Sequence, residues 1–364
     1  MIAARALLSR DPAESFTVEN IDIDEPHDDE ILVRMKATGI CHTDLVARRA
    51  GSAERPVLLG HEGAGVVESV GRSVRGIDPG DHVVLTFRHC GVCGNCRQGR
   101  PAYCVDGHAL NQFGVRADGT SRVVTSTGAP VLDGFFGQSS FSEFALTRQD
   151  NTVVVDRDID LAVAAPLGCS VQTGAGAVLN VLKPRSGDTV VVHGAGGVGM
   201  AAVLAAITTG ARVIAVERSS ARRELASSLG AHVVIDPASE DARAALLDAT
   251  DGGATHAIDT TGNAEVIVDA MAALGKGGTL AIVALGRGVL QLDLLDTVLS
   301  GRGIRGCLEG DAVPQQFIPA LAEMYSAGAL PVDRLITRYP YDRIDSALGD
   351  HRRGDTVKPV LEWP

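Results

Sequence analysis

The sequence predicts an α/β protein in which a doubly wound parallel sheet is joined to a second, β-rich domain. From Val171 to about Gly306, strand-like and helix-like segments alternate, which is typical of a parallel sheet with crossover helices. Residues 1 to about 168 are instead rich in strands and turns, which indicates a separate β domain. A chain of 364 residues is long enough for two domains with one core each.

The parallel-sheet domain opens on a strand at 190–193, followed by a glycine-rich turn at 194–199, an apolar helix at 200–207 and a strand at 212–216 that ends on Glu217. The order of strand, Gly-x-Gly-x-x-Gly turn, helix, strand and acid is typical of a βαβ unit that binds a dinucleotide. The alternative for such a turn is a glycine-rich loop without a ligand. The complete arrangement favours the dinucleotide site.

Each glycine of the turn has an expected role. Gly194 permits the tight turn, Gly196 lets the backbone approach a pyrophosphate, and Gly199 lets the helix pack close to the strand. The helix then offers free N–H groups and a partial positive charge to the phosphates. Glu217 is expected to accept hydrogen bonds from the adenosine ribose. Its carboxylate predicts NAD over NADP, although the adjacent Arg218 is suited to a 2′-phosphate.

The remaining elements follow from apolar patterns and turn residues. In the β-rich part, strands are expected at 31–35, 64–70 and 82–86, where glycines and Pro79 mark the turns. After Glu217 we expect helix 221–229, strand 233–235, helix 241–249, strand 256–259, helix 266–274 and strand 279–284. Helix 315–327 and strand 358–361 then return to the first domain. The predicted boundaries are 1–168, 169–306 and 307–364.

Composition limits the possible partners. A net charge of −12 without a basic stripe argues against nucleic acid. No apolar run is long enough to span a membrane, and the first residues run directly into a strand-like pattern without a signal peptide, so we expect a cytoplasmic protein. The seven cysteines then indicate metal binding more than disulfides.

Four of the cysteines form a compact motif. Cys90, Cys93, Cys96 and Cys104 have a spacing that lets four thiolates close a tetrahedron around zinc, with glycines that let the loop bend. Such a site has no position free for a substrate, so a structural role is expected. An iron–sulfur cluster and two local disulfides are the alternatives that spacing alone leaves open.

A second set of candidate ligands is dispersed along the chain. Cys41 follows a strand, His61 lies in Gly60-His61-Glu62-Gly63-Ala64-Gly65, and Cys169 directly precedes the nucleotide domain. Two thiolates and one imidazole leave one tetrahedral position open, as in catalytic zinc sites. Buried cysteines and histidines without a metal are the alternative.

These motifs together carry a family resemblance. The segment Gly60-His61-Glu62-x-x-Gly65, followed by Gly71 and Val74, the four-cysteine lobe and the glycine turn stand in the order seen in zinc-dependent alcohol dehydrogenases of the medium-chain dehydrogenase/reductase superfamily. The resemblance covers nearly the whole chain. Within the superfamily, the lobe and the segment 317–359 most resemble bacterial aryl- and benzyl-alcohol dehydrogenases.

The resemblance implies a GroES-like catalytic domain, a Rossmann domain that binds NAD, and two zinc ions per chain, one catalytic and one structural. It further implies a role for each of several residues. Cys41, His61 and Cys169 are expected to hold the catalytic zinc, with Asp44 orienting His61, Glu62 behind the metal and Thr43 accepting the alcohol proton. For the cofactor it implies Thr173 at the nicotinamide, Arg222 at the adenosine ribose, His42 and Lys358 at the pyrophosphate, and Gly194, Gly196, Gly197, Val198 and Gly199 in the turn.

Two positions depart from the family pattern. Val46 stands where relatives with a full proton relay have a histidine, so the outer end of the relay is altered. His42 stands where many relatives have an arginine, which predicts a weaker or pH-dependent grip on the pyrophosphate.

The expected reaction is reversible oxidation of a primary aryl or allylic alcohol to its aldehyde. The resemblance places Phe135 and Phe136 in the substrate channel, with Leu285 and Leu308 at the opposite wall. Such an apolar, aromatic pocket favours a flat substrate. A glutathione-adduct formaldehyde dehydrogenase, a broad-range aliphatic alcohol dehydrogenase and a non-enzymatic dinucleotide sensor are the alternatives. Relatives imply a homodimer or homotetramer.

Overall fold

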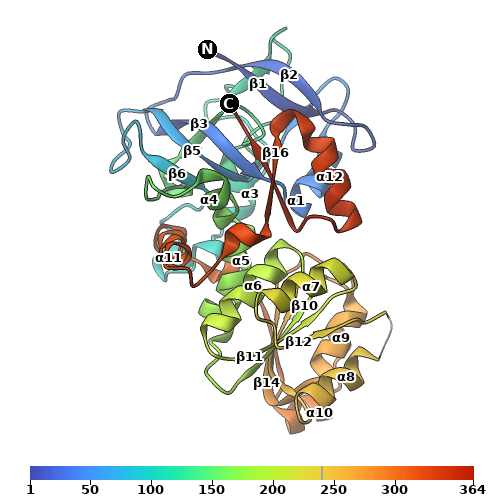
Figure 1. Cartoon of the computed structure of the whole chain (residues 1–364). Helices are drawn as coiled ribbons and strands as arrows, with labels where there is room; N and C mark the ends of the chain where they lie inside the picture. Colours follow the sequence, from blue (N-terminus) through green and yellow to red (C-terminus); the bar gives the residue numbers. More distant parts are fainter. Residues whose placement is uncertain (239–240) are drawn as a thin grey trace. The chain divides into compact units, whose positions relative to one another are not determined.

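The chain folds into two compact units, shown in Figure 1. The structure is a computed structural model that describes residues 1–238 and 241–364. Unit 1 comprises Met1–Cys169, Val313–Ser326 and Ile336–Pro364, and unit 2 comprises Ser170–Ala312 and Ala327–Leu335. Each unit is therefore assembled from stretches that are far apart in the sequence.

Unit 1 contains two β-sheets. A four-stranded sheet has the order β4-β1-β2-β7, and a larger sheet has the order β16-β17-β3-β5-β6-β9, with β8 also pairing with β3. The strands are β1 (Ile2–Ser9), β2 (Thr17–Ile23), β3 (Glu30–Gly39), β4 (Val57–Leu58), β5 (Glu62–Val70), β6 (His82–Leu85), β7 (Val123–Thr125), β8 (Phe144–Arg148), β9 (Thr152–Val154), β16 (Ile336–Pro340) and β17 (Lys358–Glu362). The expected β-rich domain is thereby confirmed, with β17 closing it from the far end of the chain.

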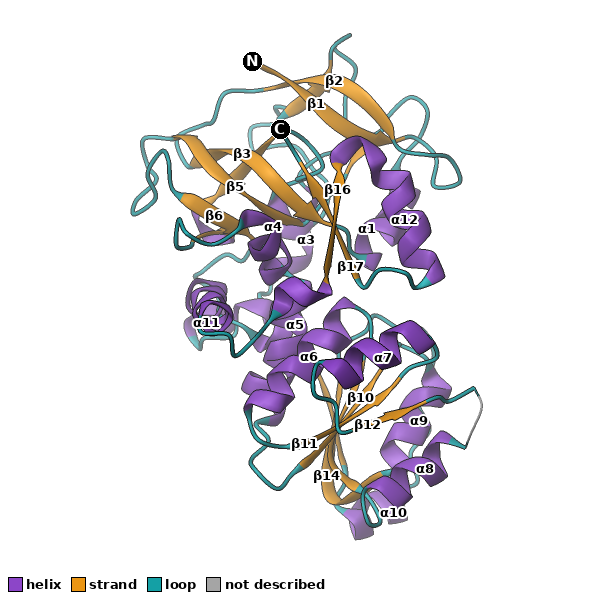
Figure 2. Cartoon of the chain, in the orientation of Figure 1, coloured by secondary structure: helices purple, strands orange, loops and turns teal. Residues whose placement is uncertain are grey.

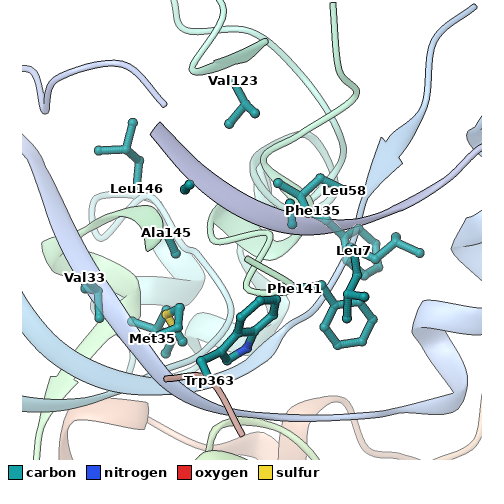
Figure 3. Packing of buried hydrophobic residues seen from close by; sticks show 14 of the residues in the cluster. Leu7, Val33, Met35, Leu58, Val123, Phe135, Phe141, Ala145, Leu146 and Trp363 are labelled. Atoms are coloured by element: carbon teal, nitrogen blue, oxygen red, sulfur yellow. The ribbon is translucent and has the colours of Figure 1, made fainter. Parts of the chain in front are cut away.

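Short helices connect these strands. They are α1 (His42–Ala47), α2 (Gly94–Arg97), α3 (Gly107–Asn111) and α4 (Leu161–Ala164), and the returning segments add α11 (Pro314–Ser326) and α12 (Ile344–Arg353). The apolar residues of β3 explain its central place, because Ile31, Leu32, Val33 and Met35 are all buried. Figure 3 shows Val33 and Met35 within a core that extends to Phe135, Phe141 and Trp363.

Unit 2 is a doubly wound sheet of six parallel strands, as predicted. The strand order is β12-β11-β10-β13-β14-β15, so the order reverses between β10 and β13. The strands are β10 (Thr189–His193), β11 (Arg212–Val216), β12 (Val233–Ile235), β13 (Ala254–Asp259), β14 (Leu274–Ile282) and β15 (Gly303–Gly306). Val190, Val191 and Val192 of β10 are buried, as expected for a central parallel strand covered on both faces.

Helices cover both faces of this sheet. Figure 2 shows α6 and α7 on one side and α8 and α9 on the other. The helices are α5 (Ser170–Gly176), α6 (Gly197–Thr208), α7 (Ser220–Ser228), α8 (Ala242–Ala249), α9 (Ala264–Ala272) and α10 (Leu294–Ser300). Helix α5 lies close to α6 because Gly174 has no side chain: a Cβ there would stand 2.1 Å from the carbonyl oxygen of Val198.

Two details differ from the sequence predictions. The return to unit 1 begins at Val313 rather than at 307, because residues 308–312 pack against α5, and residues 327–335 rejoin unit 2. The sequence Phe141-Ser142-Glu143-Phe144 predicts a strand in which apolar and polar residues alternate, but β8 begins only at Phe144. The amide N–H of Glu143 donates to Arg5 of β1 and its carbonyl oxygen accepts from Met35 of β3, so this segment passes between the two sheets.

One membrane-related feature can be read from helix length and composition. Within the described residues, no single helix is long and apolar enough to cross a membrane, although the bent pair Leu161–Gly168 and Ser170–Leu182 passes the same test jointly.

Candidate active site

Three residues that are distant in the sequence bring metal-binding atoms together in unit 1. Cys41 caps the start of α1, His61 directly precedes β5, and Cys169 ends a short helical segment. Their sulfur and nitrogen atoms, with a carboxylate oxygen of Glu62, all lie within 4.8 Å of one another. His61, Glu62 and Cys169 are buried, and Cys41 is half-buried. The four donor groups therefore enclose one point that is shielded from most of the solvent.

The Asp44 carboxylate organises this cluster. Its Oδ1 lies 2.8 Å from His61 Nδ1 and accepts the amide N–H of Gly60 at 3.1 Å. Its Oδ2 accepts the amide N–H of Cys41 at 3.0 Å. This arrangement places the proton of His61 on Nδ1 and leaves the lone pair on Nε2. That Nε2 atom is buried and has no hydrogen-bond partner among the described residues, as fits a metal ligand.

The electrostatics of the cluster favour the thiolate form of Cys41 and the protonated form of His61, so a metal ion would displace the proton of His61 Nε2 on binding. A hydrogen bond with Cys169, followed by the charge of His61, holds the pKa of Cys41 well below its usual range despite burial. Cysteine binds metals as the thiolate. Burial lowers the pKa of His61, but the charges of Asp44 and Cys41 outweigh this effect and raise it. Two thiolates, one imidazole and an open fourth position fit catalytic zinc.

Lys358 comes to this cluster from β17. Its Nζ lies 2.9 Å from both carboxylate oxygens of Glu62 and donates to the carbonyl oxygen of Ile40 at 3.0 Å. Burial lowers the pKa of Lys358, but the charges of Glu62 and Cys41 outweigh it and raise the pKa. Gly39 makes room for this ion pair, since a Cβ there would lie 2.0 Å from Glu62 Oε2. The expected contact of Lys358 with a pyrophosphate stays a prediction.

Two phenyl rings flank the imidazole of His61. The ring of Phe136 stacks on it with centroids 4.6 Å apart and planes 27° apart, and the ring of Phe135 meets it edge-on at 5.5 Å and 88°. The loop that carries them is unusual, because Phe136 has φ 51° and Ser139 has φ 49°. Left-handed backbone at residues other than glycine is strained and is found mainly at functional sites.

Gln138 holds the same loop against the histidine. Its Nε2 donates to the carbonyl oxygens of His61 at 3.0 Å and Thr86 at 3.3 Å, and its Oε1 accepts the amide N–H of Gly63 at 3.2 Å. Gln138 is buried. Gln138 was not among the predicted site residues, because an isolated glutamine in an irregular loop carries no periodic signal.

Three further predicted residues lie on α1. Thr43 Oγ1 is 3.7 Å from Cys41 Sγ, so the hydroxyl expected to accept a proton is next to the metal-binding atoms. His42 is exposed, and Val46 is 49% exposed on the same helix. The valine side chain cannot carry a proton, so a relay through this helix does not continue beyond Thr43 by way of Val46.

The second cysteine cluster is complete. The sulfur atoms of Cys90, Cys93, Cys96 and Cys104 lie within 4.8 Å of one another, with 3.5 Å between Cys93 and Cys96 and 4.0 Å between Cys90 and Cys96. Four sulfurs at the usual Zn–S distance are about 3.8 Å apart. Backbone N–H groups, including that of Cys96, lower the pKa of Cys93 to about 6. The donor set and spacing fit zinc.

Unit 2 carries the predicted dinucleotide turn. Gly194 has φ 89°, and a Cβ on Gly199 would lie 1.9 Å from the carbonyl oxygen of Gly194. A Cβ on Gly196 would meet nothing within 4 Å, so the space beside this glycine is open, as a bound pyrophosphate requires. Glu217 Oε2 accepts the amide N–H of Ala195 at 2.7 Å, and Oε1 accepts that of Ser219 at 2.9 Å.

Other predicted cofactor and substrate residues also lie in unit 2. Thr173 is on α5, with Oγ1 3.5 Å from a carboxylate oxygen of Glu309. Arg222 is on α7 and Gly197 and Val198 begin α6. Leu285 is 84% exposed and Leu308 is 42% exposed, so both side chains are available for contacts.

Comparison with known proteins assigns the chain to a family. Residues 27–157 match the alcohol dehydrogenase GroES-like domain, and residues 197–326 match the zinc-binding dehydrogenase family. A geraniol dehydrogenase from Castellaniella defragrans is 44% identical over 99% of this chain and 98% of its own length. The chain belongs to the zinc-binding alcohol dehydrogenase family.

Solved structures of family members agree with the fold. An alcohol dehydrogenase zinc-binding domain protein from Burkholderia ambifaria has a TM-score of 0.96 and 42% identity, covering 100% of this chain and 99% of the other. Benzyl alcohol dehydrogenase from Acinetobacter calcoaceticus has a TM-score of 0.94 and 40% identity, covering 100% of both chains. This alcohol dehydrogenase family member therefore keeps the complete two-unit architecture of its relatives.

Proposed function

We propose that this protein oxidises a primary aryl or allylic alcohol, such as benzyl alcohol, to the aldehyde and transfers the hydride to NAD. The observation that carries the substrate class is the pair of phenyl rings, Phe135 and Phe136, packed on the imidazole of His61. A wall of aromatic carbon beside the reacting centre favours a flat, conjugated substrate over a small hydrated one. Relatives named for geraniol, an allylic alcohol, and for benzyl alcohol support this class.

The residues of unit 1 supply the oxidation chemistry. Cys41, His61 and Cys169 hold zinc, which supplies a Lewis acid that lowers the pKa of a bound hydroxyl. Asp44 fixes the orientation of His61. Thr43, next to Cys41, would accept the hydroxyl proton while releasing its own proton toward the nicotinamide ribose. The phenyl rings exclude water from one side of the site, and the nicotinamide cofactor would supply the hydride acceptor.

The cofactor is NAD, bound along the carboxyl edge of the sheet in unit 2. Gly194, Gly196 and Gly199 form the turn for the pyrophosphate, and Glu217 is the acid for the ribose. Thr173 contacts the nicotinamide, and Arg222 the adenosine ribose. The lobe of Cys90, Cys93, Cys96 and Cys104 holds a second, structural zinc. We also propose that the enzyme acts in the cytoplasm, where thiols stay reduced and free to bind metal.

A ratio of activities tests the substrate class. We expect kcat/KM for benzyl alcohol to exceed that for ethanol well over tenfold, since a buried ring contributes several times the roughly 1–3 kcal/mol of one methylene group. Phe136→Ala should reduce the ratio, and Phe16→Ala, in the core away from His61, is the matched control. Equal values for the two alcohols contradict the aryl assignment and leave a broad-range alcohol dehydrogenase. Preference for the thiohemiacetal of glutathione and formaldehyde identifies the glutathione-dependent alternative.

The enzyme is also proposed to form a homodimer or homotetramer through unit 2. Seven large apolar side chains between 285 and 299 are exposed, four of them on α10: Leu294, Leu295, Val298 and Leu299. Helix α10 packs against β14, whose neighbour β15 is the edge strand of the sheet, and the outer N–H and C=O groups of an edge strand are suited to pairing with a second copy. Val298→Glu should shift the protein to monomers in analytical ultracentrifugation, whereas the exposed Val115→Glu should not. An unchanged oligomer contradicts this interface.

A further inference from the structure

A third phenyl ring, which the proposed function does not use, adjoins the two rings beside His61. Phe113 stacks on Phe135, with ring centroids 5.1 Å apart and planes 19° apart. Phe135 in turn meets Phe136 edge-on, with centroids 4.9 Å apart and planes 73° apart. Phe135 is buried, whereas Phe113 is half-buried. Phe113 is therefore the outer member of a continuous cluster of rings that ends on the imidazole of His61.

The loop that carries Phe135 and Phe136 needs support from outside itself. Phe136 and Ser139 have left-handed backbone, and such strain persists only where the surrounding structure imposes it. Gln138 supplies part of this support through its hydrogen bond to the carbonyl oxygen of His61. That bond acts on the end of the loop, so the two phenyl rings depend on packing for their positions.

The segment that carries Phe113 is anchored on its N-terminal side by α3. Asn111, the last residue of this helix, accepts the amide N–H of Arg88 on Oδ1 at 2.8 Å. Its Nδ2 donates to the carbonyl oxygen of Arg88 at 2.9 Å and to that of Gly107, within the helix, at 2.7 Å. The end of α3 is therefore fixed to the backbone of a neighbouring segment two residues before Phe113.

The same segment is anchored on its C-terminal side to the residues that precede Phe135. The amide N–H of Gly114 donates to the carbonyl oxygen of Asp133 at 3.0 Å. Arg122 donates to the carbonyl oxygen of Gly114 and, at 3.2 Å, to Asp133 Oδ1. Its guanidinium also fills the space beside Gly134, where a Cβ would lie 2.0 Å from Nη2. The ring of residue 113 thus has fixed neighbours on both sides and little freedom to move away from Phe135.

We infer that Phe113 is a positioning residue: its ring holds Phe135 and Phe136 in place and thereby sets the preference for flat, conjugated alcohols. The inference rests on the proposed aryl-alcohol function and deepens it. Phe113 acts through Phe135 and not on the reacting atoms. Removal of its ring leaves a space into which Phe135 can shift, and the aromatic wall beside His61 then loses its fixed shape.

Steady-state kinetics of the zinc-loaded, full-length enzyme test this role with benzyl alcohol and ethanol. We expect Phe113→Ala to raise KM for benzyl alcohol about three- to tenfold, the usual effect of one aromatic pair. The value of kcat should stay within about twofold, since the wall binds the substrate ring equally before and during the reaction. Ethanol has no ring, so its kcat/KM should not change. Phe113→Tyr should restore the wild-type values, and Val115→Ala, exposed in the same loop, is the matched control.

Hydrogen exchange of the free enzyme reports on the loop without any substrate. The amide N–H groups of Gly137 and Gln138 donate to carbonyl oxygens within the loop, at 2.8 Å and 3.1 Å. We expect Phe113→Ala to speed exchange in segment 135–139 and to leave the lobe segment 90–104 unchanged, because the loosening is local. Phe113→Tyr should exchange like the wild type.

Several results would overturn the inference. An unchanged KM for benzyl alcohol in Phe113→Ala, or an equal loss of kcat/KM for ethanol, excludes a role in substrate preference. Faster exchange throughout unit 1 shows a general effect on stability. If Phe113→Ala does not fold, Phe113→Leu, which keeps an apolar side chain without the stacking, carries the same test. A wild type without preference for benzyl alcohol contradicts the proposed substrate, and exchange in segment 135–139 then decides alone whether Phe113 holds the loop.

Discussion

Lys358 Nζ lies 2.9 Å from each carboxylate oxygen of Glu62, and both side chains are buried. The pair joins the first strand residue after His61 to the first residue of β17, 296 positions further along the chain. A buried charge that loses its partner is strongly destabilising, even where the intact pair contributes little net stability. The pair therefore ties the integrity of the metal cluster to the C-terminal strand.

Removing the lysine should destabilise unit 1. We expect Lys358→Met to lower the free energy of unfolding by roughly 3–5 kcal/mol, because the buried carboxylate of Glu62 loses its ammonium partner. Chemical denaturation measures this change, with the exposed Lys276→Met as the control. The double variant Glu62→Gln/Lys358→Met should recover part of the loss. A double variant that is as unstable as Lys358→Met alone would show that packing, and not charge, accounts for the effect.

The two cysteine clusters should respond differently to the same substitution. Cys96→Ser removes one of four lobe ligands and should lower stability and zinc content, while the protein that stays folded retains much of its activity. Cys41→Ser should fold nearly normally and turn over little substrate. Metal analysis, thermal unfolding and single-substrate kinetics measure the three properties. One zinc per wild-type chain, or a stable but inactive Cys96→Ser, contradicts this division.

Glu217 should make the enzyme prefer NAD. Its carboxylate is held by the amide N–H groups of Ala195 and Ser219, so it cannot easily turn away from a 2′-phosphate. We expect kcat/KM to favour NAD over NADP by at least about tenfold, because the carboxylate repels the 2′-phosphate of NADP. Glu217→Gln should narrow the difference, and Arg218→Ala should leave it. Equal use of both cofactors by the wild type would show that Arg218 dominates.

Asp133 should make stability pH-dependent. Burial raises its pKa to about 6, although Arg122 Nη2 lies 3.2 Å from Oδ1, and Oδ2 is buried without a partner among the described residues. A folded pKa above the unfolded value of 3.8 means that the protonated form is favoured in the fold. The associated stability is present below pH 3.8 and is lost as the pH rises through about 6.

A neutral isostere isolates this effect. We compare the free energy of unfolding of Asp133→Asn with that of the wild type at each pH. The difference in favour of the variant should be roughly 1 kcal/mol larger at pH 7.5 than at pH 5. Denaturant titrations at the two pH values measure it, with the exposed Asp248→Asn as control. A gain that is constant across this range, or that shrinks as the pH rises, would mean that Asp133 is not protonated in the fold.

The sequence alone predicts those parts of the site that consist of short sequence motifs. The glycine turn, the four-cysteine lobe and the neighbourhood of His61 each need only a few adjacent residues, so local geometry is enough to recognise them. The parallel sheet was equally predictable, because β10 and β11 are continuous apolar runs. The structure of each of these motifs is determined by residues that are close together in the sequence.

Residues whose roles depend on tertiary contacts could not be predicted from the sequence. Gln138 and Phe113 lie in loops outside the helices and strands, and nothing local marks them. The ion pair of Lys358 with Glu62 spans almost the entire chain. The boundary expected at 307 lies at Val313 because the packing of Gly310 against α5, and not composition, decides where residues 308–312 belong.

The interrupted path of unit 1 also has a consequence for biosynthesis. The carbonyl oxygen of Ile40 receives the Lys358 ammonium only after 318 further residues have been joined. At typical rates of synthesis, this takes roughly 15 to 65 seconds. By the time Lys358 is added, the strands that the structure describes in unit 2 have all been synthesised, whereas β3 has until then lacked its neighbour β17. The nascent chain can thus fold its nucleotide-binding half first, and the metal cluster gains its last supporting strand only near the end of translation.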